Sequence, residues 1–524
     1  MTVNASHPRL IEGLLNPAAY PHPVAQVEVV DTHISWVLLT GQYAYKIKKP
    51  IKLDFLDFST LLLRRHLCAE ELRLNKHFAP QLYIDVVAIT GSGDQPEISG
   101  DGEPVEYAVR MHEFEQDRQL DRQQLAGKLE HQDMLDLASS VNDYHQRAAS
   151  AGLDSPYGRP EGIHKSVLDN FDLLRETAAD VEPDKREALA AWCQETFKRL
   201  TPQLELRRKQ GWIKECHGDL HLSNLVRLAD GIRAFDCIEF NPKLRWLDVI
   251  SDVAFLVMDL EVRDRPDLAY TFFNAYLEEN GDYPSLRLLN YYLVYRSAVR
   301  AKVAALRLAQ ADVPDDERLL QRLKLTKHLD LAGHYTRPGQ PMLLLMHGLS
   351  GSGKTWLSQR LLGLLPAIRV RSDLERKRLA GLRPDESSAS GFSSGLYSPQ
   401  MTRRTYQKLA EVAGEILATG RHAIVDAAFL KQKERAEFLD LARNLGVRPL
   451  IISCVADRPL LEERLEQRKI ASRDASEADI AVMEYQLTVA EPLTSVELAY
   501  TNQIDTGQPL DYQQIADAIL AKAD

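Results

Sequence analysis

Residues 348–355, Gly-Leu-Ser-Gly-Ser-Gly-Lys-Thr, have the residue types and the spacing of a loop that binds phosphate groups. The pattern is a glycine, four further residues, and then Gly-Lys-Thr. Its glycines let backbone N–H groups surround phosphates at the start of a helix, where the helix dipole also favours anions. We expect Lys354 to reach the β- and γ-phosphates and the Thr355 hydroxyl to bind Mg²⁺. The residues predicted to bind the nucleotide are Gly348, Leu349, Ser350, Gly351, Ser352, Gly353, Lys354 and Thr355.

A second group of residues has the spacing of a protein-kinase-type catalytic loop. His217 and Asp219 are followed by Asn224, and Asp236 comes after a predicted pair of short strands. Phosphoryl transfer depends mainly on positioning and charge neutralisation, so it requires one base and oxygen ligands for a shared metal. Asp219 is therefore predicted to accept the proton of a substrate hydroxyl, and Asn224 and Asp236 to hold Mg²⁺ at the ATP phosphates. His217 is expected to orient the loop rather than to react.

A lysine and a glutamate upstream of this loop are candidates for the pair that positions the α- and β-phosphates. Lys46 lies on the third predicted strand and Glu71 on the helix that follows it. Such a pair is a regular part of kinase-type sites. Lys48 shares the strand face of Lys46 and is the alternative lysine, and Glu70 is the alternative glutamate. A solvent-exposed lysine on an edge strand is the competing interpretation of Lys46.

The elements that must position these residues follow from hydrophobic periodicity. The N-terminal part predicts five strands with one helix after the third, which is the outline of the small lobe of a kinase. The strands are expected at 27–30, 34–39, 43–47, 83–89 and 105–111, and the helix at 61–78. From about residue 116 the pattern is mostly helical, with helices expected at 248–260, 268–279 and 286–309. Residues 333–341, rich in glycine and proline, predict a linker, after which strands and helices alternate from a strand at 342–346 onward.

Two sequence segments carry a family resemblance. HGDLHLSN at 217–224 and AFDCIEFNPKLRWLDVISDVAFL at 234–256 resemble the aminoglycoside phosphotransferase-like kinases, a branch of the protein-kinase-like fold. The resemblance covers roughly residues 27–335. It implies an ATP-binding cleft with a hinge near Val109 and Met111, and it implies the same base and metal ligands that the loop spacing indicates.

The resemblance also implies a role for Asp252, and at one place the sequence departs from the pattern of protein kinases. Asp252 is expected to brace the catalytic loop, with an ordinary helix residue as the alternative. Residues 31–35, between the first two strands, contain no glycine, so the cover over the phosphates is expected to be weaker or differently built than in protein kinases. The acceptor that gives the family its name does not carry over, because one fold serves many substrates.

Two carboxylates end predicted strands of the C-terminal part. Asp373 ends the predicted strand at 368–373 and is the candidate general base for the acceptor hydroxyl. Asp426 ends the next strand, at the sheet edge where ligands bind in open α/β sheets. It resembles a Walker-B or substrate-contact carboxylate. An ordinary helix N-cap is the alternative for either residue.

Arginines on a later helix have the spacing of a lid over the phosphates. Arg464 and Arg468 are one helical turn apart, and Arg473 follows. Planar guanidinium groups suit the charge of a transferring phosphoryl group, whereas the alternative is a solvated basic face. Residues 387–398 predict a mobile loop suited to acceptor binding. Together with the phosphate-binding loop, these features resemble the small P-loop kinases related to zeta-toxin and gluconate-kinase-like enzymes, over residues 342–524.

Composition limits the function classes. The chain has 524 residues, a net charge of −11 and 44% hydrophobic residues, so it is expected to be a soluble protein of several domains. The acidic balance argues against a general nucleic-acid or membrane-surface binder. No apolar run reaches the length of a membrane span, and no signal-peptide pattern is expected at the N-terminus. Five scattered cysteines predict reduced thiols, a cytoplasmic location and no zinc site.

The sequence predicts an α+β protein-kinase-like domain at 1–335, with lobes at about 27–115 and 116–335. A linker at 336–340 then leads to an α/β P-loop domain with a parallel sheet at 341–524. The expected function is transfer of the γ-phosphoryl of ATP, with Mg²⁺, to a hydroxyl of a small molecule at two sites. The alternatives are a regulatory ATP-binding protein, a protein kinase, or a nucleotide-sugar kinase of the zeta-toxin type. Sequence does not predict the acceptor, the preferred triphosphate or the oligomeric state.

Overall fold

The structure is a computed structural model, which describes residues 6–53, 56–310, 313–383, 386, 398–471 and 479–522. The chain forms two compact units. The first comprises Met1–Lys165 and Leu204–Asp259, and the second comprises Ser166–Gln203 and Leu260–Asp524. The division therefore falls before the proline- and glycine-rich segment at 333–341, and it assigns the helices after residue 260 to the same unit as the phosphate-binding loop.

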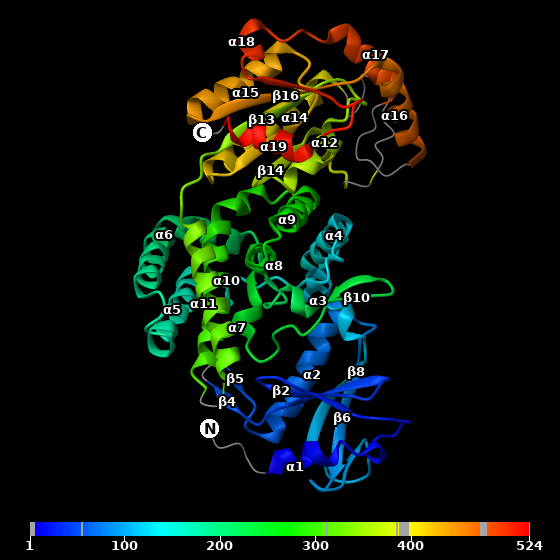
Figure 1. Cartoon of the computed structure of the whole chain (residues 1–524), viewed down its shortest axis with the longest axis vertical. Helices are drawn as coiled ribbons and strands as arrows, with labels where there is room; N and C mark the ends of the chain where they lie inside the picture. Colours follow the sequence, from blue (N-terminus) through cyan, green and yellow to red (C-terminus); the bar gives the residue numbers. More distant parts are fainter. Residues whose placement is uncertain are drawn as a thin grey trace. The chain divides into compact units, whose positions relative to one another are not determined.

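An antiparallel sheet forms the N-terminal part of the first unit (Figure 1). Its strand order is β1-β2-β3-β8-β6-β7. The five predicted strands and the single helix α2 are confirmed, and the sequence patterns missed the short strand β7 and the two-residue strands β4 and β5. The bounds are β1 Glu28–Asp31, β2 Ser35–Leu39, β3 Tyr43–Lys48, β4 Lys52–Leu53, β5 Leu56–Asp57, α2 Leu61–Phe78, β6 Tyr83–Gly91, β7 Pro96–Ile98 and β8 Glu106–His112.

Helix α2 has the residues predicted from its periodicity. It starts because the Thr60 hydroxyl accepts a hydrogen bond from the Leu63 N–H at 3.2 Å, which satisfies one of the free N–H groups of the first turn. The helix packs against β6 and β8. Its buried face contains apolar residues but also Glu71 and Asn75, both fully buried. Because buried polar groups are stable only with partners, this face of α2 is where a site is expected.

The remaining elements of the first unit surround the predicted catalytic loop. The loop lies between β9 and the hairpin β10–β11, and α7, β12 and α8 follow the hairpin. Helix α8 begins inside this unit and ends beyond Asp259. The bounds are α1 Ser6–Gly13, α3 Leu120–Leu125, α4 His131–Arg147, β9 Ile213–Glu215, β10 Leu225–Leu228, β11 Gly231–Ala234, α7 Pro242–Arg245, β12 Trp246–Asp248 and α8 Val249–Val262.

The second unit contains a five-stranded sheet of order β14-β15-β13-β16-β17, and all of its pairs are parallel. Strand β13 is central, and its residues from Met342 to Met346 are buried, as expected for a strand covered on both faces. The fifth strand, β17, was not predicted, because its residues alternate weakly between apolar and polar. The strand bounds are β13 Met342–His347, β14 Ala367–Arg371, β15 His422–Asp426, β16 Arg448–Val455 and β17 Thr501–Asp505.

Helices α9, α12, α13, α14 and α15 contact the sheet of the second unit. Among them, α9 lies directly beside β14 and α12 (Figure 1). In the described part of the chain, no helix has the length and hydropathy that crossing a bilayer requires. The bounds are α5 Pro160–Thr177, α6 Pro183–Lys209, α9 Pro266–Asn280, α10 Leu286–Leu308, α11 Asp315–Tyr335, α12 Lys354–Leu362, α13 Ser372–Leu379, α14 Pro399–Ala418, α15 Gln432–Leu445, α16 Arg458–Ala471, α17 Ile480–Val489, α18 Ser495–Leu498 and α19 Tyr512–Leu520.

Candidate functional sites

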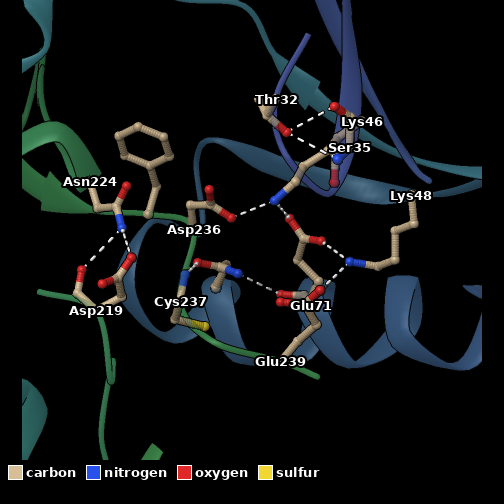
Figure 2. Close-up of polar contacts among 12 residues, drawn as sticks. Thr32, Ser35, Lys46, Lys48, Glu71, Asp219, Asn224, Asp236, Cys237 and Glu239 are labelled. Carbon is tan, nitrogen blue, oxygen red and sulfur yellow. Dashed lines mark hydrogen bonds and ion pairs between the residues drawn. The ribbon is translucent and has the colours of Figure 1, made fainter. Parts of the chain in front are cut away.

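In the first unit, Lys46, Glu71 and Asp236 come from three separate segments and meet in one ionic cluster (Figure 2). The Lys46 ammonium donates to Glu71 Oε1 at 2.8 Å and also to Asp236 Oδ1. Lys46 and Glu71 are buried, whereas the Asp236 side chain is 44% exposed. The structure thus brings the predicted lysine, glutamate and metal-ligand carboxylate together.

Lys48 extends the cluster on its other side. Its ammonium donates to Glu71 Oε2 at 2.7 Å and to Glu239, and all three groups are buried (Figure 2). The alternative lysine therefore shares Glu71 with Lys46 instead of replacing it. The alternative glutamate, Glu70, makes a different set of contacts, since it accepts from Arg245 Nη2 at 2.7 Å. Glu239 was not predicted, and its only sequence signal is an acidic residue three positions after Asp236.

Charge compensation sets the protonation of this cluster. Burial alone lowers the pKa of Lys46, but the carboxylates of Asp236 and Glu71 outweigh it and raise the pKa well above its ordinary value. Burial alone raises the pKa of Glu71, but Lys46 and Lys48 lower it to about 2. Burial raises the pKa of Glu239, which shares Lys48 with Glu71. Lys46 and Glu71 are therefore a charged pair at neutral pH.

The predicted catalytic loop places Asp219 beside Asn224. Asn224 Nδ2 donates to the Asp219 carboxylate and to its carbonyl oxygen, each at 3.0 Å. The hairpin β10–β11 then brings the two predicted metal ligands close in the chain fold, because the Phe235 N–H donates to the Asn224 carbonyl at 3.0 Å and Asp236 is the next residue. His221 Nε2 lies 3.2 Å from Asp219 Oδ2, a contact that sequence reasoning missed.

His217 connects the loop to the strand that leads into Asp236. Its Nε2 lies 2.9 Å from the Phe235 carbonyl, and its Nδ1 accepts from the Asp219 N–H at 3.3 Å. These partners assign the proton to Nε2. Burial lowers the pKa of His217, so the ring is neutral at pH 7. This placement suits the orienting role predicted for His217.

Asp252 accepts from the backbone at the start of the same loop. Its Oδ2 takes the His217 N–H at 3.1 Å and its Oδ1 takes the Gly218 N–H at 2.9 Å. His145 Nε2 lies 3.3 Å from Oδ2, so α4 holds the carboxylate in turn. A carboxylate that accepts two consecutive N–H groups fixes the loop backbone, which is the bracing geometry predicted for Asp252.

Two buried polar residues fix the backbone around Asp236. Asp236 has a φ of 59°, a left-handed conformation that costs a non-glycine residue about 1–2 kcal/mol. Its N–H donates to the Tyr83 hydroxyl, and the next N–H, of Cys237, donates to Asn75 Oδ1, each at 3.1 Å. Asn75 Nδ2 donates to the Glu71 carbonyl at 2.9 Å. Asn75 was missed, although a polar residue on the apolar face of a predicted helix is a usable signal.

The predicted hinge and phosphate cover lie on the same sheet. Val109 and Met111 are buried on β8, and Val109 is opposite Lys46 in the β3–β8 register. The turn between β1 and β2 lacks glycine and is closed by Thr32, whose hydroxyl accepts from the Ser35 N–H at 3.0 Å (Figure 2). A hydroxyl-closed turn thus takes the place of a glycine-rich loop.

In the second unit, the phosphate-binding loop joins the central strand β13 to α12. Gly353 is the N-cap of α12 with a φ of 82°. A Cβ on Gly348 would lie 2.4 Å from the Cys454 carbonyl, so the loop requires glycine there. Lys354 Nζ donates to the Leu349 carbonyl at 2.7 Å, and the Ser350 N–H donates to Gln486 Oε1 at 2.7 Å. The loop has the strand-to-helix geometry that phosphate binding needs.

Asp426 lies at the carboxyl end of β15, beside the start of α12. Its Oδ2 accepts from the Ser358 hydroxyl at 3.2 Å. Burial lowers the pKa of Lys354, although the Asp426 carboxylate acts in the opposite direction. Asp426, Lys354 and Thr355 therefore occupy the same end of the sheet, as predicted for a metal-binding or substrate-binding carboxylate.

Asp373 is located one element later than the sequence pattern suggested. Strand β14 ends at Arg371, and Ser372 and Asp373 form the first turn of α13. Arg371 is the N-cap, so Asp373 is neither the last strand residue nor the cap. The Asp373 carboxylate accepts from Arg376 Nη1 at 3.2 Å. Its role as a general base stays a prediction.

The arginines of the predicted lid have different environments. Arg464 donates to the Gly351 carbonyl at 3.3 Å and to the Thr506 hydroxyl and carbonyl at 2.9 and 2.7 Å, so it braces the phosphate-binding loop from α16. The charge of Arg468 acts on Lys354 and contributes to lowering the pKa of Lys354, after burial. Arg473 and most of the predicted loop at 387–398 lie outside the described residues.

The donor atoms at both sites suit Mg²⁺, which prefers oxygen ligands. At the first site, Asn224 Nδ2 donates to Asp219, so its amide oxygen is the atom suited to a cation, and Asp236 supplies a partly exposed carboxylate. At the second site, the Thr355 hydroxyl and Asp426 supply oxygen atoms.

The strand order and the contacts above define the class of protein. The first unit has a kinase-like fold, with a lysine–glutamate pair, a catalytic-type loop and a carboxylate after a hairpin. The second unit has a P-loop nucleotide-binding domain with a parallel sheet. The chain is therefore a fusion of a kinase-like domain with a P-loop domain.

Comparison with known proteins places the chain in a family. A family model described as an AAA domain matches residues 343–493. The chain is 30% identical over 466 residues to the uncharacterized protein Mb2027c of Mycobacterium bovis, across 88% of this chain and 90% of that protein. The chain belongs to the same family as this mycobacterial protein, and both domains are included in the match.

Solved structures with local likeness fall into two groups. An ethanolamine kinase of Plasmodium vivax is 13% identical with a TM-score of 0.37, and covers 58% of this chain and 81% of its own. The APS kinase of Mycobacterium tuberculosis is 17% identical with a TM-score of 0.25, and covers 35% of this chain and 98% of its own. The fold assignment rests on the strand order and the contacts described above.

Proposed function

We propose that the chain is an ATP-dependent phosphotransferase with two sites, each moving the γ-phosphoryl group of ATP to a hydroxyl of a small molecule. The observation that carries the proposal is the assembly in the first unit, where Lys46 and Glu71 meet the segment that contains Asp219, Asn224 and Asp236. A nucleotide-binding protein without catalysis needs no base beside its metal ligands. The P-loop domain on the same chain supports the second site.

At the first site, the proposed roles follow from the contacts. Lys46, held by Glu71, binds the α- and β-phosphates. Asn224 and Asp236 hold Mg²⁺, which neutralises the charge that develops on the phosphate oxygens. Asp219 accepts the proton of the acceptor hydroxyl. The hydroxyl oxygen bonds to the γ-phosphorus as the bond from that phosphorus to ADP breaks and ADP leaves. Asn224 orients the Asp219 carboxylate through the 3.0 Å hydrogen bond.

At the second site, the loop of residues 348–355 surrounds the phosphates with its backbone N–H groups. Lys354 binds the β- and γ-phosphates, and the Thr355 hydroxyl and Asp426 hold Mg²⁺. Asp373 accepts the acceptor proton, and Arg468 stabilises the transferring group. Arg464 acts through the Gly351 carbonyl, and so it positions the loop.

A small-molecule acceptor suits both sites better than a macromolecule. The net charge of −11 disfavours nucleic acid, and kinase-like and P-loop folds serve many small hydroxyl substrates. ATP is the proposed donor. The two acceptors are related or sequential metabolites, a proposal motivated by the fusion of the two domains. Two purified variants, each with a different site inactivated, test this proposal. The product of one variant must then be consumed by the other.

Transfer of label from [γ-³²P]ATP to a pool of sugars, nucleosides, aminoglycosides and cell metabolites tests the proposed function. The variants are Asp219→Asn, for the first site, and Lys354→Ala, for the second. Asp230→Asn and Lys408→Ala are matched controls, because both are exposed residues in solvent-facing ion pairs. A product lost only with one site variant assigns that acceptor to its site. Tight ATP binding with no labelled product from any pool would instead favour the regulatory alternative.

A further inference from the structure

Helix α9 supplies a side chain that completes the edge of the P-loop sheet. β14 is one of the two edge strands of that sheet. Asn274 of α9 donates from Nδ2 to the Ala367 carbonyl at 3.0 Å and accepts from the Arg369 N–H at 2.7 Å. The amide therefore pairs with β14 as a neighbouring strand does. The Tyr283 hydroxyl donates to the Arg369 carbonyl at 3.1 Å.

A buried ion pair adds to this contact. Arg369 donates from Nε to Glu278 Oε1 at 2.7 Å and from Nη2 to Glu278 Oε2 at 3.1 Å. The two side chains are only 2% and 10% exposed. A bidentate arginine–carboxylate pair fixes direction as well as position. Glu278 is thus the group that compensates the buried charge of Arg369.

The rest of the Arg369 guanidinium faces the helix that starts at the phosphate-binding loop. Nη1 donates to the Ser358 hydroxyl at 3.0 Å and to the Thr355 carbonyl at 3.4 Å, and Nη2 donates to Gln359 Oε1 at 2.6 Å. The Ser358 hydroxyl in turn lies 3.2 Å from Asp426 Oδ2. One guanidinium therefore connects α9 to the Thr355 backbone and, through Ser358, to Asp426.

We infer that Glu278, acting through Arg369, is a positioning residue that sets Thr355 and Asp426 for Mg²⁺ at the P-loop site. This inference rests on the proposed function of that site. It means that the site depends on α9, which lies more than sixty residues before the matched segment 343–493. Without the Glu278 carboxylate, the buried Arg369 guanidinium keeps its neutral partners but loses its carboxylate, and the next carboxylate along its hydrogen bonds, through Ser358, is Asp426. The guanidinium then competes with the cation for Asp426.

The experiment measures the Mg²⁺ concentration that supports half-maximal binding of a fluorescent ATP analogue by the full-length chain. A Lys46→Met background removes binding at the first site. In that background we expect Glu278→Gln to raise the required Mg²⁺ about tenfold or more, as loss of a partner beside metal ligands commonly does. Glu278→Asp keeps the charge but shortens the side chain, and we expect an intermediate increase.

Glu497→Gln is the matched control, because the Arg435–Glu497 pair is buried in the same unit, with side chains 0% and 4% exposed, and Arg435 donates its other hydrogen bonds to the carbonyls of Phe429, Glu491 and Pro492. An unchanged Mg²⁺ requirement in both Glu278 variants, or the same increase in Glu497→Gln, overturns the inference about Glu278 and leaves the proposed function of the P-loop site standing. Nucleotide binding by the Lys46→Met chain should be abolished by Lys354→Ala. If the Lys46→Met chain binds no nucleotide, or if Lys354→Ala leaves its binding unchanged, the proposed function of the P-loop site fails and the inference fails with it. Should Glu278→Gln not fold, Glu278→Asp decides.

Discussion

Replacing Glu71 by glutamine removes the carboxylate that Lys46 and Lys48 share. The pKa of Glu71 falls from an ordinary value of 4.5 to about 2 in the folded chain, since the two ammonium groups outweigh its burial. At about 1.4 kcal/mol for each pH unit, this difference corresponds to about 3 kcal/mol of unfolding free energy at pH 7. Removal of one partner of a buried ion pair typically costs about 3–5 kcal/mol, so the two routes to the magnitude agree.

The sign of the pH dependence follows from the same value. Because folding lowers the pKa of Glu71, its stabilisation is complete above pH 4.5 and is lost as the pH falls toward 2. Glu71→Gln should therefore be about 3 kcal/mol less stable than wild type at pH 7, and the difference should shrink at pH 3.

Urea unfolding at both pH values, together with hydrogen exchange of β3 and α2, measures this loss within the first unit. Glu70→Gln is the control, because Glu70 is the adjacent helix residue and its side chain is 20% exposed beside Arg73 and Arg245. We expect that variant to lose about 1 kcal/mol or less. Equal losses in the two variants, or a Glu71→Gln loss that does not change with pH, would refute the assignment of Glu71 as the shared partner.

Three further predictions address other parts of the two sites. Asp252→Ala should lower turnover at the first site about 100-fold, because the loop backbone loses its acceptor, while turnover at the P-loop site measured in the same preparation stays unchanged. Gly353→Ala should abolish nucleotide binding at the P-loop and destabilise the second unit by about 1–2 kcal/mol, since its φ is 82°; calorimetry that finds normal ATP binding would contradict this. Burial, helped by Arg435, lowers the pKa of His347 to about 4. The free energy of unfolding should therefore fall by up to about 1.4 kcal/mol per pH unit as the pH drops from 6.5 toward 4. The urea midpoint of His347→Asn should decline less over this pH range than that of wild type.

Local patterns were sufficient for most of the fold. Helix α2 is predicted with the observed bounds because its periodicity is encoded within a few residues. The phosphate-binding loop is predicted for the same reason, since strand, glycines and helix are consecutive. Asp219, Asn224 and Asp236 also lie within one short segment, so their spacing indicates their proximity.

Contacts between distant segments could not be predicted in the same way. The pairing of Lys48 with Glu239 joins residues 191 positions apart, and no local pattern distinguishes Glu239 from other acidic residues. The edge-strand contact between Asn274 and Arg369 depends on how α9 packs on β14. Arg464 has the helical spacing of a lid residue, but only the folded chain shows that Thr506 and the Gly351 carbonyl bind it.

The central claim is that one chain carries two separate nucleotide sites. Equilibrium dialysis with a non-hydrolysable ATP analogue and Mg²⁺ counts them directly in wild type, Lys46→Met, Lys354→Ala and the double variant. We predict two bound nucleotides for wild type, one for each single variant and none for the double variant. A single bound nucleotide in wild type, lost with Lys354→Ala and unaffected by Lys46→Met, would contradict a nucleotide site in the kinase-like domain.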